Sequence, residues 1–169
     1  MTVDTARGIV YIPIGSASTD WYGTDRIGDS LFANTLIALD AATGKRICHF
    51  QGVKHYLWDR DFPSPPALVT VDRNGRKIPA VVQTSKLGYV FVFDRANGTP
   101  LLPIEYRKFP ASTMPGEVTS ETQPVPVKPA PLAREFRTED MLTTRTPEAH
   151  EWAVKQFRPL VSQGPFIPN

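Results

Sequence analysis

Residues 36–45 read Leu-Ile-Ala-Leu-Asp-Ala-Ala-Thr-Gly-Lys, an apolar run that ends in the pattern Asp-x-Ala-x-Gly. The same pattern recurs at residues 4–8 and 94–98, each time beside apolar residues with strand character. An aspartate carboxylate accepts hydrogen bonds from a turn backbone, and the glycine adopts the positive φ that reverses the chain. The three copies therefore predict tight turns between short antiparallel strands.

Two further apolar segments, at residues 68–71 and 78–82, flank the pair Asn74-Gly75. An Asn-Gly pair between two such runs is a strong hairpin signal. The second and third Asp-x-Ala-x-Gly copies begin 54 residues apart (94 − 40), a repeat length typical of a β-propeller blade. The sequence thus predicts an all-β fold, with about two propeller blades within residues 1–106.

The second half of the chain, residues 107–169, has a different character. Most of the 17 prolines lie after residue 99, and each removes a donor from a sheet ladder. We expect residues 109–131 to be extended, residues 139–142 to form a short helical turn, and residues 147–157 to form a helix that packs on the propeller. Thr146 can cap this helix, and Pro147 suits its first turn. One face of it would carry Ala149, Trp152, Ala153 and Phe157.

The composition suits a globular protein and argues against one class of partner. Of the 169 residues, 41% are hydrophobic and 21% are charged, which is enough apolar material for a core. The net charge of +2 and the scattered basic residues argue against nucleic acid. The single cysteine, Cys48, excludes an internal disulfide. We expect no transmembrane segment, since no apolar run approaches about 20 residues, and no signal peptide at the N-terminus.

Two segments could carry chemistry. Residues 55–63 read His-Tyr-Leu-Trp-Asp-Arg-Asp-Phe-Pro, and Lys86 follows Asp59 by 27 residues (86 − 59), on the turn before an apolar strand. A carboxylate can take the hydroxyl proton when an alcohol or a sugar is oxidised, and a fixed ammonium can stabilise growing negative charge. Taken alone, both residues also fit an ordinary solvated turn.

The pattern Leu-Trp-Asp-x-Asp-x-Pro, with Lys86 at that spacing, resembles the active-site stretch of the pyrroloquinoline quinone (PQQ)-dependent dehydrogenases, membrane-bound glucose dehydrogenase type. Residues 38–45 resemble the blade motif of quinoprotein propellers. The resemblance implies that Asp59 is the catalytic base, that Lys86 contacts the quinone, and that hydride passes to it. It also implies the cofactors PQQ and Ca²⁺, with Ca²⁺ ligands mostly outside this chain, a quinone-type electron acceptor and a periplasmic location.

The loop at residues 16–26 resembles the family loop that supplies a hydroxyl and an arginine to the cofactor. Ser18 stands where the family has threonine, Tyr22 where it has tryptophan, and Arg26 where it has arginine, so the resemblance implies Ser18 and Arg26 as cofactor contacts. The other interpretation is a plain surface loop. Cys48 and Leu102 stand where the family places tryptophans that dock adjacent blades.

Family members are eight-bladed propellers several times longer than this chain. The resemblance therefore implies a fragment of a PQQ-dependent dehydrogenase that oxidises glucose or another sugar or alcohol. Its partners would be the substrate and either the missing blades or a second copy, because repeat folds bury their cores between neighbours. Two alternatives remain open: a non-catalytic propeller module for protein contacts, and an inactive truncated gene product. His49 and His150 lack partners at metal-ligand spacing, so no metal ligand is expected in this chain.

Overall fold

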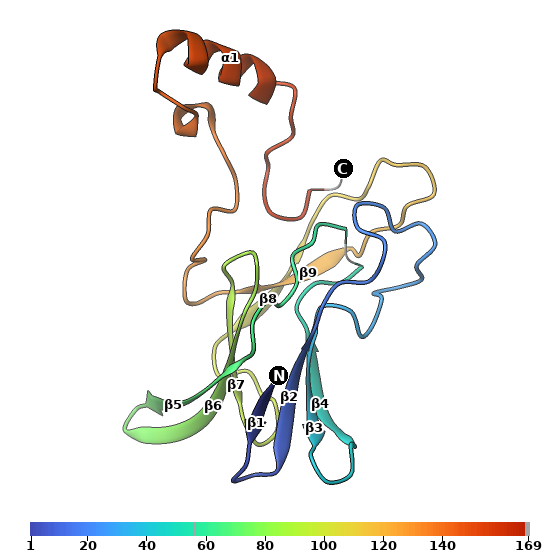
Figure 1. Cartoon of the computed structure of the whole chain (residues 1–169), viewed down its shortest axis with the longest axis vertical. Helices are drawn as coiled ribbons and strands as arrows, with labels where there is room; N and C mark the ends of the chain where they lie inside the picture. Colours follow the sequence, from blue (N-terminus) through green and yellow to red (C-terminus); the bar gives the residue numbers. More distant parts are fainter. Residues whose placement is uncertain (56, 168–169) are drawn as a thin grey trace.

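The computed structural model describes residues 1–55 and 57–167, so Tyr56, next to the Leu-Trp-Asp-x-Asp-x-Pro pattern, and the last two residues lie outside it. The first antiparallel sheet has the order β1-β2-β3-β4 and the second β5-β6-β7, while β8 pairs with β9 (Figure 1). The strands are β1 (Thr2–Asp4), β2 (Ile9–Ile14), β3 (Thr35–Asp40), β4 (Arg46–Gln51), β5 (Ala67–Arg73), β6 (Arg76–Thr84), β7 (Val90–Asp94), β8 (Ile104–Lys108) and β9 (Thr122–Pro126).

The repeated turns form as their sequence predicts. Gly8, Gly44 and Gly98 have φ values of +63°, +70° and +74°. The Asp40 carboxylate accepts the backbone N–H of Thr43 at 2.7 Å. The first two copies close the β1–β2 and β3–β4 hairpins, and the third follows β7. The β5–β6 hairpin turns at Asn74-Gly75, as expected.

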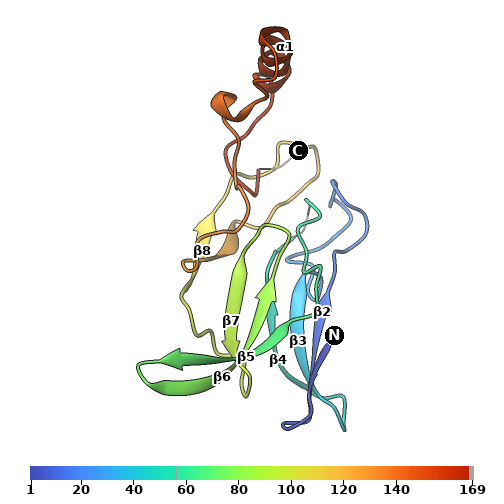
Figure 2. The same cartoon turned by 60° about the vertical axis from the view of Figure 1, so that its left-hand side comes forward.

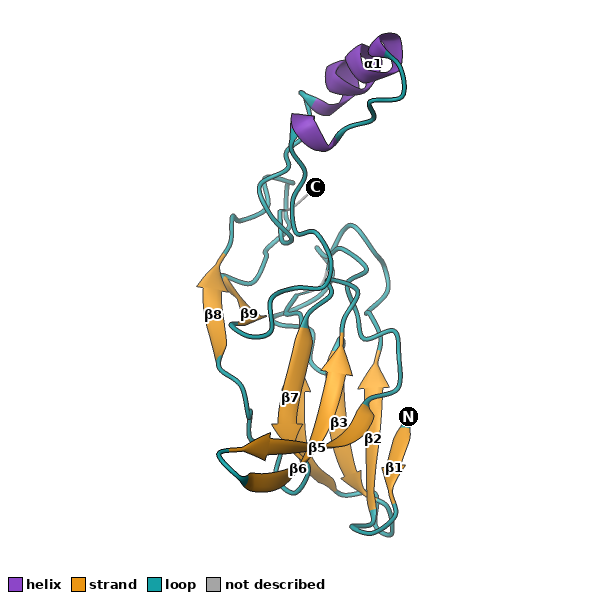
Figure 3. Cartoon of the chain, turned by 90° about the vertical axis from the view of Figure 1, so that its left-hand side faces the viewer, coloured by secondary structure: helices purple, strands orange, loops and turns teal. Residues whose placement is uncertain are grey.

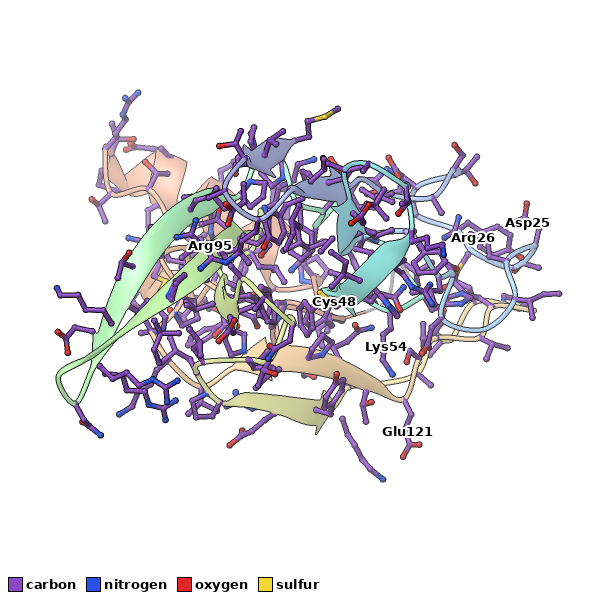
Figure 4. The ribbon with its side chains drawn as sticks, turned by 90° about the horizontal axis from the view of Figure 1, so that it is seen from below. Asp25, Arg26, Cys48, Lys54, Arg95 and Glu121 are labelled. Carbon is purple, nitrogen blue, oxygen red and sulfur yellow. The ribbon has the colours of Figure 1, made fainter. Side chains whose placement is uncertain are left out.

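The core lies between the first two sheets, which face each other in Figure 3. Phe50 of β4 meets Phe91 and Phe93 of β7, with ring centroids 4.8 and 4.9 Å apart. Asp4, only 3% exposed, pairs at 3.1 Å with Arg95, the residue that follows β7. Figure 4 shows Arg95 and Cys48 between the ribbons of these sheets. The molecule is therefore all-β, and its open sheets agree with an incomplete propeller.

The C-terminal half is less regular, as expected, but contributes a strand. β9 lies inside the proline-rich stretch and pairs with β8, which itself crosses the expected boundary at residue 106. A 3-10 turn (Glu139–Met141) precedes α1 (Pro147–Phe157). The Thr146 side chain caps α1 by accepting the N–H of Ala149. Within the described residues, no helix is both long and apolar enough to cross a membrane.

Helix α1 stands away from the sheets in two views (Figures 1 and 2) and none of its residues is buried. Trp152, on its predicted apolar face, is 67% exposed. Phe166, just after the helix, is instead fully buried. Packing of the helix itself on the propeller remains a prediction, whereas the segment that follows the helix does reach the core.

Candidate active site

Two connections bring the proposed catalytic residues together. The Asp59 loop, defined as residues 52–66, joins β4 to β5, and the Lys86 turn, residues 85–89, joins β6 to β7. In Figure 3 the loops gather above the strands of both sheets. Because the two connections leave different sheets at this same end, residues far apart in sequence can meet here.

Lys86 binds two carboxylates of the Asp59 loop. Its Nζ lies 2.7 Å from Oδ1 of Asp59 and 3.1 Å from Oδ1 of Asp61. The hydrogen bond to Asp59, followed by the one to Asp61, raises the pKa of Lys86 above its ordinary value. The side chains of Asp59 and Lys86 are 46% and 39% exposed, so a ligand can reach both.

The local backbone turns the Asp59 carboxylate outward. Asp59 has a φ of +47°, a left-handed conformation that non-glycine residues adopt rarely. The preceding residues, Leu57 and Trp58, are buried, which leaves the next side chain on the solvent side. The backbone N–H of Lys86 donates to the carbonyl of Asp61 at 3.1 Å, which joins the two connections directly.

Asp61, which contacts Lys86, was not among the site residues predicted from the sequence. It is less exposed than Asp59, at 17%, and its Oδ2 lies 3.3 Å from a Cβ placed on Gly15. Gly15 begins the loop that carries Ser18 and Arg26. The signal was present in the motif, because Asp61 is the second acidic residue of Leu-Trp-Asp-x-Asp-x-Pro.

Ser18 and Arg26 lie in the loop between β2 and β3, and Figure 4 labels Arg26 there. Ser18 is exposed. The Arg26 guanidinium donates to the Thr19 carbonyl at 2.6 Å and lies close to the His55 ring, since both would crowd a Cβ on Gly23. This hydrogen bond holds Arg26 against its own loop.

His55 is a buried residue at the start of the segment at residues 55–63. It is 3% exposed, and its Nδ1 lies 2.6 Å from the carbonyl of Gly28. A carbonyl only accepts, so Nδ1 carries the proton. His55 therefore ties the Asp59 loop to the loop that carries Arg26. Among the described residues, no three His, Cys, Asp or Glu side chains are grouped so as to hold a metal ion.

Comparisons with known proteins identify the family of this chain. A PQQ family model, described as glucose/ethanol/alcohol dehydrogenase, beta-propeller domain, matches residues 1–169. The chain is 42% identical over 124 residues to the quinoprotein glucose dehydrogenase of Gluconobacter oxydans (strain 621H), covering 72% of this chain and 15% of the relative. It is 35% identical over 122 residues to that of Escherichia coli (strain K12), covering 72% and 15%.

Solved structures show the same fold. The quinohemoprotein alcohol dehydrogenase from Comamonas testosteroni has a TM-score of 0.53 at 24% identity, over 75% of this chain and 19% of that one. A europium-containing methanol dehydrogenase has a TM-score of 0.55 at 23% identity, over 75% and 22%. The chain spans about 15% of the length of the glucose dehydrogenases that it matches. It belongs to the β-propeller family of the PQQ-dependent glucose, ethanol and alcohol dehydrogenases.

Proposed function

We propose that this chain carries the catalytic base of a PQQ-dependent oxidation of glucose or another sugar or alcohol. Asp59 is the base, and Lys86 is the cation that faces the cofactor. The observation that carries the proposal is the 2.7 Å contact between an exposed carboxylate and an exposed ammonium, on connections from two different sheets. The family supports the reaction class, and the contact supports the two roles.

The chemistry of these side chains fits a quinone cofactor. PQQ is an anionic quinone with carbonyl and carboxylate oxygens, which favour cationic donors, and the Lys86 ammonium is one. We propose Arg26 and the hydroxyl of Ser18 as further contacts, and Ca²⁺ ligands from outside this chain. When bound, PQQ would accept the two electrons that leave the substrate carbon.

The two oxygens of Asp59 have different roles in this proposal. Oδ1 accepts the hydrogen bond from Lys86, so Oδ2 is the oxygen that takes the proton of the substrate hydroxyl. Lys86 also binds Asp61, whose carboxylate keeps the ammonium in place when Asp59 becomes neutral. The ammonium then supplies positive charge where negative charge develops.

The test is a titration of the full chain with PQQ and Ca²⁺, followed by dye-linked glucose oxidation. We expect Asp59→Asn to lower kcat by about 10²- to 10⁴-fold, the usual contribution of a general base. Asp72→Asn is the matched control, because Asp72 lies in the β5–β6 hairpin and Asn can still accept the Gly75 N–H. Undiminished oxidation by Asp59→Asn would refute the proposed base.

A binding module is the second candidate function. Its support is the open architecture: β1 and β4 are edge strands of the first sheet, and β5 and β7 of the second. Ile47 of β4 is 41% exposed. Edge strands pair readily with other chains. A folded chain that binds no PQQ but forms dimers in light scattering would favour this candidate over catalysis.

A further inference from the structure

The C-terminal half of the chain contacts the Asp59 loop through a buried glutamine. Gln123, on β9, is fully buried. Its Oε1 accepts the backbone N–H of Lys54 at 2.8 Å, and its Nε2 donates to the backbone carbonyl of Lys54 at 2.7 Å. One side chain thereby satisfies both backbone groups of a loop residue 69 positions earlier. Such paired hydrogen bonds restrict both the position and the orientation of the loop backbone.

Lys54 and its neighbour also bind the connection between β2 and β3. The Nζ of Lys54 lies 3.1 Å from Oδ2 of Asp29, and the next residue, His55, donates its N–H to the carbonyl of Asp29 at 3.0 Å. Farther along, Trp58 donates its Nε1–H to the carbonyl of Ile167 at 2.6 Å. The Trp58 ring also packs on Phe166, with centroids 5.5 Å apart. The C-terminal half therefore holds the loop at two points before Asp59, at Lys54 and at Trp58.

The same half of the chain holds the Lys86 turn. The backbone N–H of Leu132 donates to the carbonyl of Gly88 at 2.9 Å. The hydroxyl of Tyr89, which is 1% exposed, donates to Oε1 of Glu135. Gly88 has a φ of +73°, and a Cβ there would collide with the backbone of Ala133. The segment at residues 132–135 thus packs directly on the turn that presents the ammonium.

These contacts are made by residues beside Asp59 and Lys86, and not by the side chains of Asp59 and Lys86. We propose that Gln123 is a positioning residue, which holds the Asp59 loop through Lys54 so that Asp59 meets Lys86, with Tyr89 as its counterpart on the Lys86 turn. The proposal rests on the proposed role of Asp59 as the base. Under this proposal the proline-rich half of the chain positions the site, although that half supplies no catalytic side chain.

The test compares Gln123→Met with Val125→Ala by NMR on the full chain. Methionine has nearly the shape of glutamine but cannot make either hydrogen bond. Val125 is a core residue on the same strand, 3% exposed, and it takes no part in the Lys54 contact. In Gln123→Met we expect the Lys54 amide to exchange with solvent about 5-fold faster, as for a lost hydrogen bond of about 1 kcal/mol.

The decisive readout is the pKa of Lys86, followed by the chemical shift of its side chain. Gln123→Met should lower this pKa toward the ordinary lysine value, because the loop that carries Asp59 and Asp61 is released. Val125→Ala should leave it unchanged, since lower overall stability does not alter a charge contact within the folded state. An unchanged Lys86 pKa in Gln123→Met would overturn the proposal.

Tyr89→Phe tests the proposed role of Tyr89 on the Lys86 turn, and it remains available if Gln123→Met does not fold. It removes only the hydroxyl that reaches Glu135, and the Lys86 pKa should again fall. The NMR readout needs no bound PQQ, so it separates the two proposals. If Asp59→Asn keeps full activity while Gln123→Met shifts Lys86, positioning of the pair stands and the catalytic role of Asp59 fails.

Discussion

A single residue, Tyr11, helps to join the two large sheets. It lies on β2, is 2% exposed, and its hydroxyl donates to the carbonyl of Arg95, beyond the end of β7, at 2.6 Å. Arg95 in turn pairs with Asp4. Burial, and next the negative charge of Asp4, raise the pKa of Tyr11 to about 12. The contact therefore depends on Tyr11 remaining neutral.

This shift predicts a loss of stability in alkaline solution. Below about pH 10 the tyrosine is neutral in both the folded and unfolded states, so its contribution is complete. From about pH 10 to 12 the unfolded chain ionises while the folded chain does not, so the free energy of unfolding falls by about 1.4 kcal/mol per pH unit. Above the folded pKa the contribution is gone.

The measurement is urea unfolding at pH 8 and pH 11 for the parent chain and for Tyr11→Phe. The variant should be less stable at pH 8, by about 1 kcal/mol for the lost hydrogen bond, and should lose less stability on going to pH 11. Other groups that titrate in this range are common to both chains and cancel. Equal losses in the two chains would show that Tyr11 is not responsible.

Among the secondary-structure elements, the two sheets pack together through a cysteine on β4 and a glycine in the turn after β7. Cys48 on β4 stands where the resemblance to quinoproteins places a tryptophan. Its Sγ would lie 2.5 Å from a Cβ on Gly98, the turn glycine that follows β7. A cavity of about 20 Å³ beside them is lined by both residues. A small side chain here faces a glycine, so β4 and the turn after β7 approach closely.

Two equivalent glycines provide a matched test of this docking. Gly44 and Gly98 occupy the same place in the Asp-x-Ala-x-Gly turn, but a Cβ on Gly44 meets nothing within 4 Å. Gly44→Ala should cost about 1–2 kcal/mol for the left-handed backbone alone. Gly98→Ala should cost a further 1–3 kcal/mol, because its methyl group overlaps Cys48.

A double-mutant cycle with Cys48→Ala isolates the clash. Removing the sulfur should recover part of the extra cost of Gly98→Ala and none of the cost of Gly44→Ala. Free energies of unfolding in urea supply all the values. Purely additive effects of Cys48→Ala and Gly98→Ala would mean that the sheets do not dock through this pair.

In the whole molecule, the segment that follows helix α1 returns to the core with one buried ring. Phe166 packs between Trp58, at 5.5 Å, and Phe109, at 4.9 Å between centroids. The chain leaves β9, runs outward to the exposed helix α1 and returns toward the sheets after the helix (Figure 1). The buried ring of Phe166 therefore connects the last described residues to the Asp59 loop.

Two aromatic substitutions should therefore differ sharply. Phe166→Ala should lower the free energy of unfolding by about 3–5 kcal/mol, the usual cost of removing a buried phenylalanine. Trp152→Ala, on α1, should change it by no more than about 0.5 kcal/mol, because the ring is exposed. Thermal unfolding followed by circular dichroism measures both, and similar costs would contradict the distinction drawn between Phe166 and the helix.

Features that depend only on neighbouring residues could be predicted from the sequence. The turns after Asp4, Asp40 and Asp94 form because a carboxylate and a glycine stand four residues apart. Helix α1 starts at its predicted cap for a similarly local reason, since Thr146 reaches an N–H three residues ahead. Local hydrogen bonds can be read from spacing, because few backbone conformations satisfy them.

Contacts between residues far apart in the sequence became visible only in the tertiary structure. Resemblance pointed to Asp59 and Lys86, but their contact, and the part played by Asp61, follow from loops of two sheets ending side by side. No sequence pattern indicated that Gln123 would bind Lys54, or that Cys48 would face Gly98. Such contacts depend on the packing of whole sheets, in which many weak apolar interactions act together and no short motif sets the outcome.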